Sequence, residues 1–485
     1  MVYIASVLFV TGCGKDDAEN IPSNGILIEV EAPRTNGWSA EENIDTRSHD
    51  AKASRQEGED GLDMEISTQP DVAERPADGA TTRWTNLDDN IIFRIVAYKS
   101  ATTAGISTSN YAGYGDYKLS GTTVQTVKSL AVPAGTYTFV CYSYGNTNAI
   151  PAFSSSSTSV SASNGQNFMT CVRPNITINN IGSKYTLSNI VFKHHCARYR
   201  IQAIAQSGRM GNITACTGSV TLPNNNATYT FTNETFNVQA ATGTTNVTWS
   251  SPNAMSIYSN YTYLLPSSSV SITVKLNPTI GGKAFTNKST TLSGLTFAAN
   301  KTYRSDVSFT TTQGYIVGGS FWARGNLYYS NGSFAFYATT TECSTNRSQD
   351  FWRWDALYPT DAFGNSSTTW NPARDPCRKI SNWRLPTMQE FQSLIQVSST
   401  YTTMNGKKGV KFSNILFLPC TGYFPGAMPD LWGNADRGLY WAQNRDNDNS
   451  AYGTMLDFKE GYYAPLLNGS NHPDNFWPIR CVRAD

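Results

Sequence analysis

The stretch Leu130-Ala131-Val132-Pro133-Ala134-Gly135-Thr136-Tyr137 has a counterpart in Leu295-Thr296-Phe297-Ala298-Ala299-Asn300-Lys301-Thr302-Tyr303. Both stretches follow the order strand, tight turn, Thr-Tyr, strand. In the first stretch, Pro133 fixes φ near the start of the turn and Gly135 accepts a positive φ later in it. In the second stretch, Asn300 can take the left-handed position. A pattern that occurs twice predicts two tandem β-sandwiches.

The composition of the chain also favours a mainly β extracellular protein. Of its 485 residues, 39% are apolar, 12% are aromatic and 15% are charged, well below the usual quarter of charged residues. This length fits two or three domains. Between residues 84 and 312, short alternating runs are separated by Gly, Pro, Asn and Ser turns, as in β-sandwiches. The predicted strands are Ile91–Tyr98, Thr136–Tyr144, Tyr185–Phe192, Ala197–Ala205, Thr228–Val238 and Val270–Leu276.

The charges are distributed unevenly along the chain. Lys and Arg total 37 against 36 Asp and Glu, so no uniform field favours nucleic acid as a partner. Residues 15–90 carry 19 acidic and 7 basic side chains, net −12, and the rest of the chain is net +13. Such an acidic block is typical of a solvated, poorly ordered tail. No apolar run is long enough to span a membrane as a helix.

The N-terminal residues resemble an export signal. Residues 1–12 form a short apolar run, and Val10-Thr11-Gly12-Cys13 resembles the lipobox of bacterial lipoproteins. The resemblance implies a signal peptide at 1–12, cleavage before Cys13 and acylation of its thiol, with palmitate among the acyl chains. Gly14-Lys15-Asp16-Asp17 is similar to the signal that sends Bacteroidota lipoproteins to the outer face of the outer membrane. The expected location is therefore the cell surface.

Cysteine usage agrees with an oxidising compartment. Besides Cys13 there are eight cysteines, an even number, and none forms a CxxC or Cys/His cluster. His194 and His195 are neighbours in a predicted strand and would face opposite sides of it. The sequence therefore predicts no metal site among these residues.

The order of several short motifs resembles the fimbrillin family, the subunits of type V pili. The motifs are the lipobox, the Arg-bearing leader at 13–83, Val132-Pro133-Ala134-Gly135-Thr136-Tyr137-Thr138-Phe139, Phe192-Lys193-His194-His195-Cys196-Ala197-Arg198-Tyr199 and Tyr263-Leu264-Leu265-Pro266. The resemblance covers residues 1–312 and implies a first sandwich at 84–182 and a second at 183–312. It also implies that a trypsin-like cut after an Arg removes the leader.

The leader contains a strand that could fill a groove in a sandwich. Gly61-Leu62-Asp63-Met64-Glu65-Ile66-Ser67 alternates apolar and polar residues. Removal of such a strand would expose backbone donors, acceptors and apolar pockets, which a strand from another subunit could fill by donor-strand exchange. A cut at Arg75 or Arg83 would release this strand because both residues follow it, and Arg83 is preferred because Trp84 opens the first folded run. The other candidates are Arg34, Arg47 and Arg55. The alternative is that these arginines only solvate a linker.

Tryptophan is concentrated in a separate C-terminal domain. Eight of the eleven tryptophans lie beyond residue 315, which requires a compact core. Thr387 and Glu390 form a capping box, so a helix with the apolar residues Met388, Phe391, Leu394 and Ile395 on one face should start there.

Residues 316–485 resemble the Fibrobacter succinogenes major paralogous domain, whose fold is similar to C-type lectin-like modules. The resemblance depends on Phe321-Trp322-Ala323-Arg324-Gly325-Asn326-Leu327, Asp375-Pro376-Cys377, Asn382-Trp383-Arg384-Leu385-Pro386-Thr387, Gly438-Leu439-Tyr440-Trp441 and Pro478-Ile479-Arg480-Cys481-Val482-Arg483. It implies an α+β fold and a disulfide between Cys377 and Cys481. Cys343 and Cys420 remain as a pair by elimination. The pairing of Cys141, Cys171, Cys196 and Cys216 stays open.

Two polar loops around an aromatic pair are the candidate ligand site. Clustered Asp and Asn side chains suit Ca²⁺ or sugar hydroxyls, and an exposed aromatic ring can stack on a sugar. The candidate residues are Asp430, Asn434, Asp436, Tyr440, Trp441, Asn444, Asp446 and Asp448. The ligand would be a glycan or a surface protein of a host or another bacterium, and the alternative is a polar loop without a ligand.

Three functions are compatible with these features. In the first, the chain is an adhesin at the tip of a type V pilus, because its C-terminal segment is folded into a cross-linked domain and is not free to be donated. In the second, it is a non-polymerised surface lipoprotein that binds polysaccharide or anchors pili. The third, an enzyme, is not expected: Cys377 and Cys481 have a structural role, and Glu390, one of the carboxylates Glu342, Glu390 and Glu460, already caps a helix.

Overall fold

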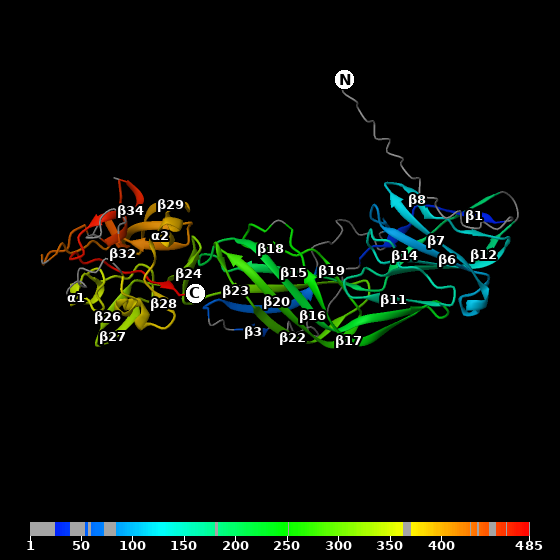
Figure 1. Cartoon of the computed structure of the whole chain (residues 1–485), viewed down its shortest axis with the longest axis horizontal. Helices are drawn as coiled ribbons and strands as arrows, with labels where there is room; N and C mark the ends of the chain where they lie inside the picture. Colours follow the sequence, from blue (N-terminus) through cyan, green and yellow to red (C-terminus); the bar gives the residue numbers. More distant parts are fainter. Residues whose placement is uncertain are drawn as a thin grey trace, which may run out of the picture.

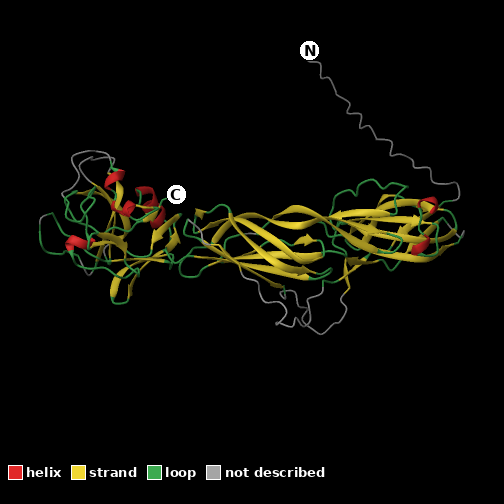
Figure 2. Cartoon of the chain, turned by 90° about the horizontal axis from the view of Figure 1, so that it is seen from below, coloured by secondary structure: helices red, strands yellow, loops and turns green. Residues whose placement is uncertain are grey.

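The structure is a computed structural model of the chain, which describes residues 25–38, 54–56, 60–71, 84–179, 183–250, 252–361, 370–426, 428–433, 436–445, 453–461 and 463–484. Most elements are strands, so the predicted mainly β class is confirmed. The sheets follow one another along a single long axis (Figures 1 and 2). We name three groups of sheets in chain order: the first body (84–194), the middle body (197–310) and the C-terminal body (314–484). No helix in the described ranges is long and apolar enough to cross a membrane.

The first body packs a three-stranded sheet on an eight-stranded one. The large sheet has the order β5 (Trp84–Asn86), β2 (Arg34–Asn36), β14 (Val191–His194), β12 (Met169–Ile178), β10 (Gly135–Ser143), β6 (Ile92–Tyr98), β7 (Tyr111–Ser120) and β8 (Thr123–Lys128). The small sheet is β13 (Lys184–Leu187), β1 (Ile26–Val30) and β9 (Ala131–Val132). Apolar side chains of both sheets meet in one buried cluster.

The middle body also consists of two packed sheets. One contains β11 (Ser159–Ser163), β16 (Ile213–Thr230), β17 (Thr235–Val247), β20 (Ser267–Ile280), β21 (Lys283–Ala284) and β22 (Lys288–Phe297). The other contains β18 (Ser256–Tyr258), β19 (Thr262–Leu264), β15 (Ala197–Ala205), β23 (Thr302–Thr310), β4 (Asp63–Pro70) and β3 (Ser54–Gln56). Strand β11 comes from the first body and pairs with β16, so the two bodies are joined by a continuous ladder.

The C-terminal body has short sheets and two helices. Its sheets are β24 (Gly314–Val317), β25 (Ser320–Ala323), β35 (Val482–Arg483) and β28 (Trp383–Arg384); β26 (Leu327–Ser330) and β27 (Ser333–Phe336); β29 (Ser399–Met404), β30 (Lys407–Phe412) and β31 (Leu416–Pro419); and β32 (Arg437–Arg445), β33 (Gly453–Lys459) and β34 (Tyr463–Asn471). The helices are α1 (Arg347–Asp350) and α2 (Met388–Ile395). Thr387 and Glu390 form the predicted capping box at the start of α2.

The middle and C-terminal bodies share one buried apolar cluster, which includes Ile280, Ile316 and Phe321. Backbone hydrogen bonds cross the junction from Gly211 N to Ile316 O at 3.0 Å and from Gly319 N to Gly281 O at 2.8 Å. Strand β24 therefore packs against the middle body, while it pairs with β25 of the C-terminal body.

Two predictions about the sandwiches are wrong. The predicted boundary at residues 182 and 183 assigns β13 and β14 to the second sandwich, but β13 pairs with β1 and β14 with β12 and β2. The predicted strand Thr228–Val238 is the hairpin between β16 and β17, with Glu234 at a φ of 54°. Alternation along the chain does not reveal which strand is the neighbour, and a polar turn inside a run of strand-forming residues is easily missed.

The two repeated turns differ in their glycine and asparagine. Asn300 has a φ of 60°, as predicted. Gly135 lies in the extended region at the start of β10, opposite Ile178, and is not among the described residues with positive φ. The prediction for Gly135 is therefore wrong, because the residue is already part of the ladder.

Candidate functional site: the leader strands and the grooves that hold them

The acidic leader contributes strands to both sandwich bodies. In Figure 1, β1 lies in the first body and β3, in the same blue, lies in the middle body. The expectation of a solvated tail is wrong for four described segments of the leader, which are paired in sheets: Ile26–Val30, Arg34–Asn36, Ser54–Gln56 and Asp63–Pro70.

Strand β4 is the groove-filling strand that the alternation at residues 61–67 predicted. It runs antiparallel to β23, with Asp63 opposite Thr310 and Pro70 opposite Tyr303. Leu62, Met64 and Ile66 are at most 1% exposed and belong to the core shared by the middle and C-terminal bodies. Glu65, between them, points to solvent. The leader therefore supplies part of the hydrophobic core of the middle body.

An Asp-Gly pair holds the beginning of this segment. The Nζ of Lys288, a side chain only 5% exposed, contacts Asp60 Oδ1 and donates to Leu62 O at 2.8 Å. Leu62 N donates to Asp60 Oδ1 at 3.1 Å. Gly61 has a φ of 80°, and a Cβ on it would lie 2.7 Å from Cε1 of Phe321. Only glycine meets both conditions without strain.

A buried carboxylate holds the other end. Asp71 is 2% exposed, and its Oδ2 contacts Arg200 Nε and accepts from Tyr261 Oη at 3.0 Å. Its Oδ1 lies 3.7 Å from Arg304 Nη1. Its backbone N donates to Thr302 O at 3.0 Å. A carboxylate buried to this degree is stabilised only with such partners.

The first body holds the leader by a different set of contacts. β1 lies between β13 and β9, and Ile26 and Ile28 are buried in the core. Tyr117 Oη donates to Ile28 O at 2.8 Å. Next to it, β2 lies between β14 and β5. Each sheet of the first body thus has one leader strand, β1 or β2, between two other strands.

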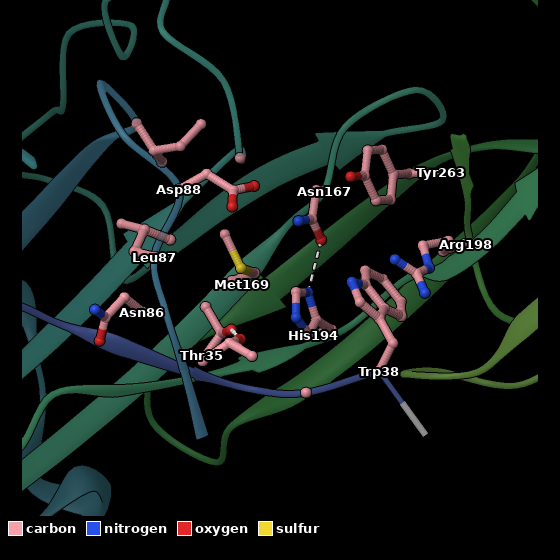
Figure 3. A pocket seen from close by; sticks show the side chains of 14 residues that line it. Thr35, Trp38, Asn86, Leu87, Asp88, Asn167, Met169, His194, Arg198 and Tyr263 are labelled. Atoms are coloured by element: carbon pink, nitrogen blue, oxygen red, sulfur yellow. Dashed lines mark hydrogen bonds between the residues drawn. The ribbon is translucent and has the colours of Figure 1, made fainter. Parts of the chain in front are cut away.

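A cavity of about 450 Å³ lies where the leader leaves the first body (Figure 3). Trp38 of the leader stacks on His194, with ring centroids 4.0 Å apart, and its ring lies 5.0 Å from Arg198 Cζ. Tyr263 is stacked at 5.8 Å from Trp38, and Asn167 Oδ1 lies 2.8 Å from His194 Nδ1. The leader side chain therefore forms one wall of this cavity.

His194 is buried and hydrogen-bonds Asn167, whereas His195 is half-buried and hydrogen-bonds Thr170. Burial, followed by the charge on Arg198, lowers the pKa of His194 to about 3. Burial and the charge on Lys193 lower the pKa of His195 to about 4. Both rings are therefore neutral at pH 7.

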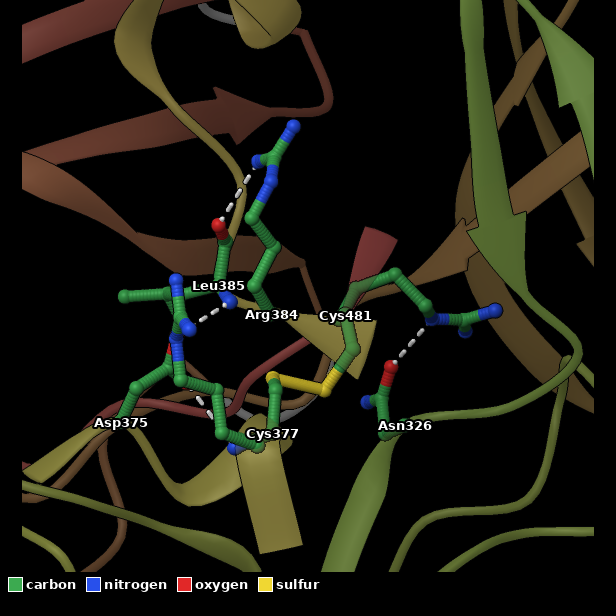
Figure 4. Close-up of a disulfide and its surroundings, with 8 residues drawn as sticks. Asn326, Asp375, Cys377, Arg384, Leu385 and Cys481 are labelled. Atoms are coloured by element: carbon green, nitrogen blue, oxygen red, sulfur yellow. Dashed lines mark hydrogen bonds and ion pairs between the residues drawn. A yellow bond between two sulfur atoms is a disulfide. The ribbon is translucent and has the colours of Figure 1, made fainter. Parts of the chain in front are cut away.

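The C-terminal body contains a disulfide between Cys377 and Cys481, the pair that the family resemblance implies (Figure 4). It joins the segment before β28 to the residue directly before β35. Asp375 Oδ1 accepts from Cys377 N and Oδ2 from Leu385 N, both at 2.9 Å, and burial raises the pKa of this carboxyl to about 6. The fully buried Arg480 donates to Asn326 Oδ1 at 2.9 Å.

The other cysteines in the described ranges are free thiols. The pairing of Cys343 with Cys420 is therefore wrong, because elimination imposes no geometric condition on the two side chains. Cys141 and Cys171 lie directly opposite each other on β10 and β12.

The candidate ligand residues that the structure describes in the C-terminal body have different environments. Tyr440 is 0% and Trp441 1% exposed, so the prediction that they offer a ring face to a sugar is wrong. Both lie on β32 inside the core, where Trp441 packs on Trp477 with centroids 3.7 Å apart. Asn444 Oδ1 accepts from Met388 N at the start of α2, at 2.8 Å.

The remaining candidates have varied positions. Asp430 is exposed, and Asp436 Oδ2 lies 3.6 Å from Lys459 Nζ. Trp432, which was not among the candidates, is 49% exposed, and Met428 is 50% exposed. The backbone of Trp432 pairs with Tyr423 in an isolated bridge. Asn434, Asp446 and Asp448 lie outside the described residues, as do Cys13, Arg47, Arg75 and Arg83.

The described residues include no group of three or more His, Cys, Asp or Glu side chains that could hold a metal ion. Among the carboxylates considered for catalysis, Glu390 pairs with Arg384 at 2.7 Å and Glu460 with Lys408 at 2.9 Å. The Ca²⁺ interpretation for the loops at 430–448 stays a prediction, since half of its donors are not described.

No family model matches the chain, and no curated protein matches its sequence. Among solved structures, a candidate cell adhesion protein from Bacteroides fragilis is 14% identical with a TM-score of 0.40, covering 64% of this chain and 96% of its own. The fimbrial anchor protein Mfa2 of Porphyromonas gingivalis is 11% identical with a TM-score of 0.24, covering 52% of this chain and 77% of its own. The tip fimbrial protein Mfa3 of the same organism is 11% identical with a TM-score of 0.27, covering 46% of this chain and 94% of its own.

Proposed function

We propose that this chain is a pilus-associated surface adhesin whose leader occupies a groove that a strand of another subunit later fills. The observation that carries the proposal is β4, a leader strand whose Leu62, Met64 and Ile66 complete the core of the middle body. A cut after Arg75 or Arg83 would leave the leader, with β4, attached to the rest of the chain by non-covalent contacts alone. Its departure would expose the backbone of β23 and three apolar pockets, the features that a donor strand recognises.

We assign the chain to the tip of the filament. Strand β35 is paired with β25 and β28 and is next to Cys481 of the disulfide. A strand held in this way is not available to a neighbouring subunit. The chain would accept a strand and present its C-terminal body outward, toward a glycan or a surface protein. Trp432 and Asp430 are the exposed side chains of that body that we propose for ligand contact.

A second candidate is a non-polymerised surface lipoprotein that anchors pili or binds polysaccharide. It is favoured by the way in which the leader strands β1, β2 and β4 are internal to their sheets, since the uncut chain needs no partner. In that case the lipid on Cys13 would hold the whole chain at the outer membrane.

Immunogold electron microscopy of purified filaments, with antibodies against residues 316–485, tests the assignment. Label at filament ends, together with protein that begins after Arg75 or Arg83, supports the tip. Label spaced regularly along the shafts overturns it. Full-length protein with acylated Cys13, found by mass spectrometry at the base of filaments, establishes the anchor instead.

A glycan array tests the ligand. We expect binding by the full chain and at least tenfold weaker binding by Trp432→Ala, since loss of one stacking ring weakens sugar contact by roughly 1.4 kcal/mol or more. Tyr401→Ala, a change at a half-buried aromatic on β29, is the matched control. Equal binding by wild type and Trp432→Ala would remove this residue from the site.

A further inference from the structure

The groove that holds β4 has cationic side chains at both ends. Lys288 stands at one end and Arg200 with Arg304 at the other, and their side chains are 5%, 15% and 16% exposed. The carboxylates that face them, Asp60 and Asp71, both belong to the leader. Charge complementarity therefore exists between the leader and the groove, in addition to the apolar contacts.

Two of the three cations at the groove, Arg200 and Lys288, pair with carboxylates of the leader. Arg304 also pairs with Asp306, at 2.7 Å from its Nε. Arg200 lies over the rings of Tyr258 and Tyr261, which supply no full negative charge. Lys288 lies 5.8 Å from the ring of Phe285. Departure of the leader thus removes Asp71 from Arg200 and Asp60 from Lys288, and a neutral strand that covers these cations again would leave them without a counter-charge, which is unfavourable.

The beginning of the leader segment that contains β4 places a steric condition on any strand that occupies the groove. Gly61 has a φ of 80° and lies against Phe321, Arg483 and Gln313, three side chains contributed from the C-terminal body and the residue before it. A side chain at this position would be strained in its backbone and would collide with the Phe321 ring. The occupant must therefore be glycine at the point where it enters the groove.

We infer that this groove selects a strand with the order Asp-Gly, then apolar residues at alternate positions, then a carboxylate nine residues after the first apolar residue. The occupant to which we commit is the donor strand of another subunit with this pattern. The inference rests on the proposed strand replacement and deepens it, because it states which partner strand is accepted. A neutral donor strand would have the backbone pairing and the apolar contacts but would leave Arg200 and Lys288 buried without a counter-charge.

Peptide exchange on the full chain tests the inference. Specific protease sites are placed at 39–53 and 72–83, so that cutting both converts β3 and β4 into a separate fragment. A fluorescent peptide of residues 59–72 is then exchanged into the cut protein and its affinity is measured by anisotropy. Four variant peptides are compared with it: Asp60→Asn, Gly61→Ala, Asp71→Asn and, as the matched control on the exposed face of the same strand, Glu65→Gln.

We expect the wild-type and Glu65→Gln peptides to bind equally, and the other three to bind at least about tenfold more weakly. The two Asn variants lose a charge partner, and Gly61→Ala meets the ring of Phe321. Five peptides that bind equally would overturn the inference while strand replacement stands. If no peptide enters the groove, strand replacement at this site fails, and the inference fails with it.

A variant of the protein provides the reciprocal test. In a cut chain carrying Arg200→Gln, the preference for Asp71 over Asn at that position should shrink, whereas the preference at position 60 should persist. If the preference for Asp over Asn were unchanged at both positions, Arg200 would not be the partner that distinguishes the Asp71 carboxylate from an amide. That result would overturn the assignment of Asp71 as a recognition residue. The preference is the ratio of the affinities of two peptides for the same protein variant. A general loss of stability would weaken the binding of both peptides and would leave this ratio unchanged.

Discussion

The leader contacts the first body at an ionisable side chain. His194 is buried beneath Trp38 and faces the cationic side chain of Arg198. A proton on His194 would place a second positive charge in that contact. The folded chain therefore excludes the proton, whereas the unfolded chain binds it with an ordinary pKa.

Acid should therefore weaken the first body through His194. Its pKa is lowered from 6.5 to about 3, so its contribution to stability is complete above pH 6.5 and is lost as the pH falls toward 3. Between pH 7 and pH 5 the loss is about 2 kcal/mol, which urea unfolding can measure. His194→Gln should lose less over this range, and His472→Gln, an exposed control, should behave as wild type. An equal acid response of His194→Gln and wild type would contradict this origin.

The disulfide is the second feature at the residue scale. Cys377→Ser with Cys481→Ser should lower the free energy of unfolding of the C-terminal body by roughly 2 to 5 kcal/mol, because the closed loop is long. Cys343→Ser, at a free and half-buried thiol, is the control and should change little. Urea unfolding followed by tryptophan fluorescence is the measurement, and identical transitions for the double variant and wild type would contradict the prediction.

At the scale of the element, β4 is a strand whose two faces have different roles. Its inward residues Met64 and Ile66 belong to the core, while Glu65 faces solvent. A core position resists truncation because the lost methylenes leave a cavity. An exposed position of the same strand does not.

Ile66→Ala should destabilise the pairing of β4 with β23 by about 2 to 5 kcal/mol. Hydrogen exchange of the amides of Tyr303–Thr310, the pairing partners of β4, should then accelerate. Glu65→Ala should leave the exchange rates within a factor of about two, as for most surface changes. Faster exchange in both variants, or in neither, would show that β4 is not held through its apolar face.

The capping box of α2 is the element that local sequence predicted most directly. Thr387 Oγ1 accepts from Glu390 N at 3.1 Å, and Glu390 Oε2 accepts from Thr387 N at 2.8 Å. The four residues from Thr387 to Glu390 contain all the information that this motif requires. The strands that surround it could not be assigned in the same way, because their partners lie far away in the chain.

At the scale of the whole molecule, the leader is distributed over two bodies. It supplies β1 and β2 to the first body and β4 to the middle body. A single cut in the segment 72–83 therefore breaks one covalent link and leaves the strand pairing of both bodies in place. Cleavage and departure of the leader are separate events.

We expect trypsin-cut protein to co-elute with its leader in size-exclusion chromatography under native conditions. Release should occur only in denaturant or in the presence of a competing strand, since the buried Ile26, Ile28, Met64 and Ile66 must all be exposed first. A leader that separates immediately after cutting at neutral pH would contradict the account of its attachment. Protein with Arg83→Gln is the control and should stay uncut in this segment, since Arg75 is followed by Pro76 and trypsin does not cut Arg-Pro bonds.

Much of the candidate site could be predicted from local pattern, and the errors have a common cause. The alternation of Leu62, Met64 and Ile66 predicted a groove-filling strand, and an Asp and Asn cluster suggested a ligand loop. The same loops surround Tyr440 and Trp441, which were expected at the surface and lie in the core. The sequence of a strand that is covered on both faces does not differ from that of a strand with an exposed aromatic face. The difference lies in the neighbouring sheets that pack on the strand.

The sequence by itself determined the features that depend on a few adjacent residues: the turn at Asn300, the cap at Thr387, the alternation of the leader strand and the mainly β class. Only the tertiary structure decided which sheet each leader segment enters, which aromatics stay exposed, and which cations face Asp60 and Asp71. The physical reason is the distance along the chain. Lys288 and Asp60 are 228 positions apart, and their contact exists only after β4 is paired with β23 and packed against β22.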